Sequence, residues 1–314
     1  MITIYKSTPK GLMEIEEYES GCWIHVVNPT DKEISSLIHL FELPFDFVTD
    51  PLDIDERARI EVEDDIRLVL IRTPRREPED AAIPYITLPI GIILVKDIII
   101  TVSISEIDVM TEFIDGRVRN FQTQFQTRFL LQLCYRTTLR YLRYLKEINR
   151  MTNALELGLL STPKNEQLIQ LFNLQKSLLY FTTSLRTNSL MIEKLRCNSF
   201  FLPMVSDEED LYEEIVIENK QALEMASIYT TILASMMNAF TSMVNNDLNA
   251  VLKLLTSITI VIALPTLIAS IYGMNVQLPM QESELGFIFV IGITIAITIP
   301  CVFLLWRNEM LKQA

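Results

Sequence analysis

The sequence is poor in the residues that build thiolate metal sites and phosphate-binding loops. It has two histidines, His25 and His39, and four cysteines, none of them in a Cys-x-x-Cys spacing. A structural zinc site is therefore not expected, and the cysteines are expected to be reduced and buried. There are only 8 glycines and no glycine-rich phosphate loop. No set of residues supports a hydrolase or a transferase, so we expect neither an enzyme nor an organic cofactor.

Basic residues are also in short supply, since the net charge is −13. This balance makes nucleic acid an improbable partner and favours cations instead. The N-terminal residues Met1–Ile4 lack the basic-then-apolar pattern of a signal peptide. The large N-terminal part is therefore expected to stay in the cytosol.

Charge is missing altogether from two long runs near the C-terminus. Leu254–Tyr272 is 19 residues without Asp, Glu, Lys, Arg or His, and a second uncharged run covers Leu285–Trp306. As helices rising about 1.5 Å per residue, both are long enough to cross a hydrocarbon core of about 30 Å. The alternative is a pair of buried core helices, but length and lack of charge favour two transmembrane helices behind a soluble body.

Residues 1–115 predict a cytosolic α/β domain. Thr30-Asp31-Lys32-Glu33 matches a capping box that opens a helix ending near Phe41. Lys96-Asp97 is typical of a tight hairpin turn, and Pro74–Pro84 is expected to be a polar loop. Strands rich in β-branched residues are expected at Ile2–Tyr5, Trp23–Val27, Ile66–Arg72, Ile86–Val95 and Ile98–Ser103. An acidic cluster, interpreted as solvated surface rather than as a metal site, comprises Asp53, Asp55, Glu56, Glu61, Glu63, Asp64 and Asp65.

Residues 116–203 predict a cytosolic helical hairpin. Its first helix is expected over Phe121–Leu160, and Thr162 with Pro163 is expected to open a second helix that ends near Phe200. The segment Met204–Leu264 then has neither Gly nor Pro. With Ser206 as cap, a helix continuing to Tyr272 has about 65 residues and a length on the order of 100 Å. Such a helix needs partners, and Pro265 is expected to kink or loosen it.

The predicted domain division follows from these elements. The α/β domain is 1–115 and the hairpin is 116–203. The stalk part of the long helix is 204–253, and the first transmembrane helix with its closing motif is 254–275. An external loop (276–284), the second transmembrane helix (285–306) and a cytosolic tail (307–314) complete the chain.

One side of the first span becomes small and hydroxylated toward its end. Steps of three or four from Leu252 reach Leu255, Thr259, Ala263, Thr266 and Ser270. These residues share one face of a helix. Such a stripe has two interpretations, which are close helix–helix packing or a water-lined path in an oligomer.

The residues that close the span resemble a known family. Tyr272-Gly273-Met274-Asn275, at the outer end of the first of two C-terminal spans, is similar to the signature of CorA-type magnesium channels. Asn249, Leu252, Lys253 and Leu255 also sit where that family keeps its pore mouth and gate. The architecture of the whole chain fits the family, whereas the sequence-specific match is confined to about Asn249–Asn275.

The resemblance implies a homopentameric funnel with the long helices around a central pore. It assigns Gly273, Met274 and Asn275 to a selectivity filter for hydrated magnesium, with Gly273 letting the backbone turn out of the helix. For Asn275 alone, a helix C-cap is the alternative. Leu252 and Leu255 would form a hydrophobic gate, and Glu282 and Glu284 would attract cations at the mouth. The implied pore-lining residues are Asn249, Leu252, Leu255, Thr259, Ala263, Thr266 and Ser270.

The resemblance also implies feedback, in which cytosolic magnesium bridges carboxylates of neighbouring subunits and holds the pore shut. Glu214 takes the position of the family's stalk carboxylate, with Glu213 and Glu218 nearby. The alternative is a solvated acidic helix start. The partner carboxylate does not map cleanly, because the corresponding loop is Thr73-Pro74-Arg75-Arg76-Glu77.

Charge flanking the spans predicts their orientation. Lys253 precedes the first span, Arg307 and Lys312 follow the second, and the loop between them has no Lys or Arg. The positive-inside bias places both termini in the cytosol of a cell membrane protein. Three hypotheses remain. The first is a channel for magnesium, with cobalt and nickel as further ions, and the second is a zinc transporter of the same superfamily, with or without proton coupling. The third is a non-conducting membrane-anchored scaffold or sensor.

Overall fold

The computed structural model of the protein describes residues 1–9, 11–161, 165–197, 205–276, 278–279 and 285–308. The chain forms two compact units, Met1–Ser235 and Met236–Ala314, and each is considered by itself. The boundary falls within helix α6 (Ser206–Tyr272), which therefore contributes to both units. The finer division into seven segments expected from the sequence stays a prediction.

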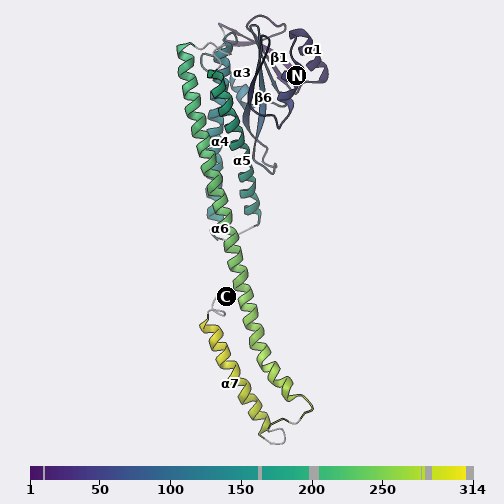
Figure 1. Ribbon diagram of the computed structural model, residues 1–314, viewed down its shortest axis with the longest axis vertical. Coiled ribbons are helices and arrows are strands. Elements are labelled where there is room, and N and C mark those ends of the chain that lie inside the picture. Colours follow the sequence, from purple (N-terminus) through teal and green to yellow (C-terminus); the bar gives the residue numbers. More distant parts are fainter. Residues whose placement is uncertain (10, 162–164, 198–204, 277, 280–284, 309–314) are drawn as a thin grey trace. The chain divides into compact units, whose positions relative to one another are not determined.

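The N-terminal unit is built on a seven-stranded sheet with the strand order β2-β1-β3-β7-β6-β5-β4 (Figure 1). β3 pairs with β7 in parallel, and the other neighbouring strands pair antiparallel. The strands are β1 (Ile2–Thr8), β2 (Gly11–Ile15), β3 (Trp23–Val27), β4 (Arg59–Glu63), β5 (Ile66–Arg76), β6 (Tyr85–Val95) and β7 (Ile98–Ser103).

The five strands expected from β-branched runs are confirmed, and so is the turn between β6 and β7. Val95 pairs with Ile98 across that turn, and Lys96 adopts a left-handed φ of 50°. A positive φ at the first turn residue is what a two-residue hairpin requires, because it matches the twist of the strands.

Two expectations for the sheet were wrong or incomplete. β5 continues through Arg76, with Pro74 opposite Thr87 and Arg76 opposite Tyr85, where the sequence predicted a loop. β6 is as long as β5 and supplies partners along its whole length. The edge strands β2 and β4 were not predicted, and neither were the short helices α2 (Phe45–Thr49) and α3 (Asp108–Ile114) nor the 3-10 turn η1 (Asp50–Leu52).

Each face of the sheet has its own core. Val69 and Ile71 of β5 pack in one hydrophobic cluster with Phe129 of α4 (Gln126–Ser161). Leu68 and Leu70 point the other way, because side chains alternate along a strand. They join a second cluster. That cluster also contains residues of α1 (Asp31–Phe41) and α2.

The predicted capping box opens α1. The Glu33 backbone N–H donates to Thr30 Oγ1 at 3.4 Å, and the Thr30 N–H donates to the Glu33 carboxylate at 2.8 Å. Two backbone donors of the first turn are thereby satisfied, which fixes where the helix begins.

The predicted hairpin is confirmed as α4 and α5 (Asn165–Cys197), with α4 beginning five residues later than expected. Thr162, Pro163 and Phe200 lie outside the described residues. The Asn188 side chain of α5 donates to the Arg72 carbonyl at 2.8 Å and accepts from the Arg72 N–H at 3.0 Å. Tyr141 of α4 donates to the same carbonyl at 3.0 Å, so both helices are tied to strand β5.

α6 begins at Ser206, which is its first helical residue and not its cap. The Val205 carbonyl accepts the first helical bonds, and the Val205 N–H donates to the Glu208 carboxylate at 3.0 Å. Tyr212 then donates to the Ile192 carbonyl at 3.2 Å, and Asn219 donates to the Leu185 carbonyl at 3.3 Å. These bonds hold the start of α6 against α5.

The C-terminal unit contains the rest of α6 and the antiparallel helix α7 (Gly286–Arg307), which run side by side (Figure 1). Both expected spans are confirmed as helices long and apolar enough to cross a membrane, with mean hydropathies of 2.2 and 2.8. α6 continues as a helix through Pro265.

The buried histidine of β3 has an environment that responds to pH. His25 is 8% exposed, and its Nδ1 lies 3.0 Å from Thr101 Oγ1, which also accepts the Trp23 indole N–H at 2.8 Å. With its lone pair occupied by Trp23, the Thr101 hydroxyl is free to donate to a neutral His25. Burial disfavours the charged imidazole and lowers its pKa to about 4.

We predict that the protein loses stability as the pH falls from about 6.5 toward 4. In this range the unfolded chain binds a proton at His25 that the folded chain does not, so stability rises with pH. The difference amounts to at most about 3 kcal/mol. Thermal melting in detergent should show a shallower pH dependence for His25→Gln than for His39→Gln, which removes the exposed histidine. Equal pH profiles for the two variants would contradict the prediction.

Candidate functional site

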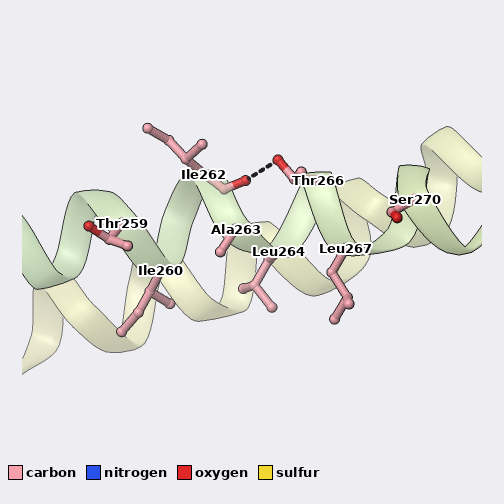
Figure 2. A pocket seen from close by; sticks show the side chains of 8 residues that line it. All are labelled: Thr259, Ile260, Ile262, Ala263, Leu264, Thr266, Leu267 and Ser270. Atoms are coloured by element: carbon pink, nitrogen blue, oxygen red, sulfur yellow. Dashed lines mark hydrogen bonds between the residues drawn. The ribbon is translucent and has the colours of Figure 1, made fainter.

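The candidate site is the exposed face of α6 in the C-terminal unit. The predicted pore-lining residues Asn249, Thr259, Ala263, Thr266 and Ser270 are all solvent-exposed in the single chain. Exposure is not confined to this side, because Ile258, Ile262, Leu267 and Ile271 on the apolar sides of the span are exposed as well. Figure 2 shows Thr259, Ala263, Thr266 and Ser270 along α6, with the α7 ribbon beside it. One chain therefore leaves the stripe uncovered together with most of the span, and what distinguishes the stripe is its small and hydroxylated residues.

Hydroxyl groups on this face point their lone pairs outward. Thr259 donates to the Leu255 carbonyl and Thr266 to the Ile262 carbonyl, both at 2.8 Å. A threonine that donates its proton to the preceding turn keeps acceptor capacity toward its surroundings. Water bound to a cation is a good hydrogen-bond donor, so this face suits a hydrated cation better than a bare anion.

The face is polar at intervals and apolar between them. An open groove of about 760 Å³ runs along it. It is lined by Thr259, Ile260, Ile262, Ala263, Leu264, Thr266, Leu267 and Ser270 (Figure 2). Toward the N-terminal end of the span, Leu252 and Leu255 are 49% and 59% exposed. Both predicted gate residues therefore lie on the uncovered side of α6.

The backbone itself closes the end of α6. The Gly273 N–H donates to the Ala269 and Ser270 carbonyls at 2.9 and 3.2 Å, and the Met274 N–H donates to Ile271 at 3.2 Å. Neither Gly273 nor Asn275 is among the residues with positive φ, so Asn275 does not act as a left-handed cap. Its side chain is exposed at the helix end.

The role expected of Gly273 is corrected in one respect. Its φ is not in the left-handed region, so the chain does not leave the helix through a conformation reserved for glycine. A Cβ at this position would lie 3.3 Å from the Ala269 carbonyl oxygen, closer than most such contacts. Glu282 and Glu284, predicted at the mouth, lie outside the described residues.

The three carboxylates predicted to regulate the pore lie in different surroundings. Glu214 accepts a 2.8 Å hydrogen bond from the Tyr135 hydroxyl of α4. That bond, with burial and the charges of Glu214 and Glu218, raises the pKa of Tyr135 to about 12. Glu213 lies in a small pocket with Arg196. The contact of Tyr135 with Glu214 could not be predicted from the sequence, because no local pattern links α4 to the start of α6.

Glu218 borders a groove that is richer in cations than in carboxylates. The groove is lined by Leu139, Leu142, Arg143, Lys146, Glu147, Arg150, Glu218 and Gln221. Three basic side chains against two acidic ones make this a poor site for a dication. Glu213 and Glu214, both exposed, fit one half of a carboxylate site better.

Within the described residues of one chain, no three His, Cys, Asp or Glu side chains come together as metal ligands. In the segment where the partner carboxylate was sought, Glu77 pairs with Arg75 at 2.5 Å, and Arg75 also donates to Ser105 at 2.8 Å.

The acidic cluster of the N-terminal unit is organised around a cation of its own. Arg59 forms ion pairs with Asp50, Glu56 and Glu61. The interpretation of this cluster as solvated surface stays a prediction.

Comparisons with known proteins bear on the whole chain. A family model described as "CorA-like Mg2+ transporter protein" matches residues 18–307. A cobalt/magnesium transport protein CorA from Methanocaldococcus jannaschii is 27% identical over 292 residues, covering 91% of this chain and 90% of that protein.

Solved structures show the same fold. The complete CorA magnesium transporter from Methanocaldococcus jannaschii superposes with a TM-score of 0.80 at 24% identity, covering 97% of this chain and 96% of that one. The ZntB cytoplasmic domain from Vibrio parahaemolyticus gives a TM-score of 0.61 at 15% identity, covering 78% of this chain and 97% of the domain.

Proposed function

Because the chain belongs to the CorA-like family of Mg²⁺ transporters, we propose that it is an integral membrane protein that carries divalent cations, with magnesium as the main ion. The observation that carries this proposal is the stripe of small and hydroxylated residues on α6, which runs from Leu252 to Ser270 and is followed by Gly273-Met274-Asn275. Such a face is unfavourable against lipid but suited to a water-filled axis.

In the proposed assembly, copies of α6 surround that axis as a homopentamer. The stripe lies on one side of each helix, and a closed ring brings identical stripes together. The apolar remainder of each span then faces lipid or α7. Cations move down their electrochemical gradient through the centre.

Selectivity is proposed to reside at the end of α6. Mg²⁺ prefers oxygen ligands and releases its water reluctantly. A ring of Asn275 side chains, with carbonyls of Gly273 and Met274 nearby, would hold the hydrated ion by neutral oxygens. Thr266 and Ser270 would accept hydrogen bonds from its water further in.

The gate is proposed at Leu252 and Leu255. Rings of exposed leucine side chains exclude water when they approach one another, and an ion cannot cross a dry constriction. Lys253 beside them, and Arg307 after α7, favour an orientation with both termini in the cytosol. Glu282 and Glu284 would then attract cations from outside.

Regulation is proposed to act on the N-terminal part of α6. Cytosolic magnesium bound by Glu213 and Glu214 of one chain and by oxygens of its neighbour would hold adjacent copies in the closed arrangement. Glu218 contributes less, because cations line its groove.

Zinc transport is the second candidate, and the fold shared with a ZntB cytoplasmic domain favours it. The stripe argues for magnesium instead. Its polar members are threonine, serine and asparagine, which are hard oxygen donors, whereas zinc prefers histidine and cysteine. A non-conducting scaffold would leave the hydroxyls and the amide of the stripe without a role.

We predict that Asn275→Ala lowers magnesium uptake into vesicles containing the purified protein by at least about tenfold, the equivalent of about 1.4 kcal/mol. The amide oxygen that holds the hydrated ion is lost, while the helix end keeps its backbone bonds. Asn153→Ala, which removes an exposed amide from α4, serves as the control. Equal uptake by the two variants would remove Asn275 from the selectivity site.

Ion substitution distinguishes magnesium from zinc. We expect wild-type vesicles to take up magnesium and cobalt faster than zinc, and we expect a proton gradient to leave the magnesium rate unchanged. Zinc uptake that exceeds magnesium uptake and depends on the proton gradient would favour the second candidate.

We predict that the three carboxylates contribute unequally to the inhibition of uptake by internal magnesium. Neutralising Glu213 and Glu214 to Gln should raise the internal magnesium concentration that halves uptake, by several-fold, because the dication loses charged ligands. Glu218→Gln should have a smaller effect. Titration of internal magnesium measures this, and unchanged inhibition in the double variant would exclude these residues as the sensor.

A further inference from the structure

The part of α6 that precedes the membrane span is exposed and yet has no charge. From Met225 to Asn246 there are 22 residues without Asp, Glu, Lys, Arg or His, bounded by Glu224 and Asp247. Many of them, Ile232 and Val244 included, are exposed in the single chain. A helix surface that remains in bulk water normally carries charged residues. This segment therefore has the composition of a surface that is covered in the assembled protein.

Two rows of residues run along opposite sides of this segment. Ile215, Ala222, Ala226 and Leu233 are buried within their own chain, at steps of seven, four and seven. A second row, displaced by two residues or about 200°, starts at Ile217 and reaches Leu252 in alternating steps of four and three. A strict alternation of this kind stays on one side of a helix that winds gently around its neighbours.

The second row is neutral and polar for most of its length. Its members between Glu224 and Leu252, apart from Ile228, are Thr231, Ser235, Asn238, Ser242, Asn245 and Asn249, and all are exposed or nearly so. Each offers a neutral oxygen. Around a common axis they would line a hydrated space, as Thr259 and Thr266 do further along.

Two large apolar residues bound this polar stretch. Leu252 closes it toward the membrane, and Ile228, which is 56% exposed, closes it toward the cytosol. They are 24 residues apart, or about 36 Å along the helix. Ile217 is on the same row but lies beyond Glu224, whose carboxylate keeps that level hydrated.

We propose that Ile228 forms a second apolar collar in the assembled protein, distinct from the gate at Leu252 and Leu255, at the cytosolic end of a neutral chamber. This rests on the proposed function only in that copies of α6 surround a water-filled axis. A ring of isoleucine side chains excludes water at close approach, so an ion passes only when the ring widens. The pathway then has two constrictions in series, and the hydrated ion waits between them among neutral oxygens.

The test measures access to the chamber rather than transport. Asn245→Cys places a thiol between the two collars, and Gln221→Cys places one on the same row outside Ile228. Full-length protein in lipid nanodiscs is treated with a small, permanently charged alkylthiosulfonate, and the modification rate at each introduced cysteine is read from its peptide mass. Asn245→Cys should react at least tenfold more slowly than Gln221→Cys.

Adding Ile228→Asn should wet the collar and speed modification at Asn245→Cys at least tenfold, while the rate at Gln221→Cys stays unchanged. Adding Ile228→Leu keeps the collar apolar and should leave both rates as they were. Elution of every variant as the same assembly guards against misfolding. If Asn245→Cys is modified at the same rate with and without Ile228→Asn, the proposal is overturned.

The result separates the collar from the proposed function. If vesicles take up magnesium but the modification rate does not depend on residue 228, the proposed collar is wrong and the proposed transport function is kept. If labelling follows position 228 but no ion is taken up, the collar stands and the transport proposal fails.

Discussion

The constraint on which the structure depends is that α6 carries polar groups into a layer that cannot solvate them. A hydroxyl or an amide left without a hydrogen-bond partner in hydrocarbon costs several kcal/mol. Thr259 and Thr266 reduce this penalty by donating to carbonyls one turn back. Their lone pairs, and the whole amide of Asn275, still need partners. In the proposed assembly, water or a hydrated ion on the axis would be that partner.

The N-terminal unit fixes the start of that helix. Asn188 and Tyr141 tie the hairpin to strand β5 through the Arg72 backbone. The hairpin in turn holds α6 through Tyr212 and Asn219. α6 has no glycine between Ser206 and Tyr272, so it has few points at which to bend independently. The proposed regulatory carboxylates, Glu213 and Glu214, and the proposed gate residues therefore belong to one helix.

Sequence reasoning succeeded where a single segment determines its own structure. The span Leu254–Tyr272, the capping box at Thr30 and the turn at Lys96 were predictable, because hydrophobic length, cap chemistry and turn chemistry are local. The extension of β5 through Pro74 and Arg75 was not. Proline and charged residues indicate a loop unless a long partner strand is present, and β6 supplies that partner from elsewhere in the chain. Edge strand β4 was not predicted, because its charged residues obscure the alternation of apolar and polar residues that is typical of a strand.

The candidate site shows the same division. The stripe on α6 could be predicted from helical spacing, whereas its role in a pore stays a prediction. Two features join α4 to α6, the hydrogen bond from Tyr135 to Glu214 and the basic groove around Glu218. The local sequence of neither helix predicts them. Because of these contacts Glu213, Glu214 and Glu218 differ in their surroundings, a difference that sequence spacing alone cannot predict.

The distribution of charge along α6 indicates how a dication would be held yet released. A full carboxylate ring on the axis would hold Mg²⁺ tightly, since the attraction between opposite charges grows in a confined, poorly solvated space. Between Glu224 and Asp247 this chain has only neutral residues, and Thr, Ser and Asn occupy the positions that face the axis in the proposed assembly. Weak, multiple oxygen contacts with hydration water let an ion enter and leave without a deep trap. Glu224 and the predicted external residues Glu282 and Glu284 lie toward the two ends of the proposed pathway, where negative charge would raise the local cation concentration.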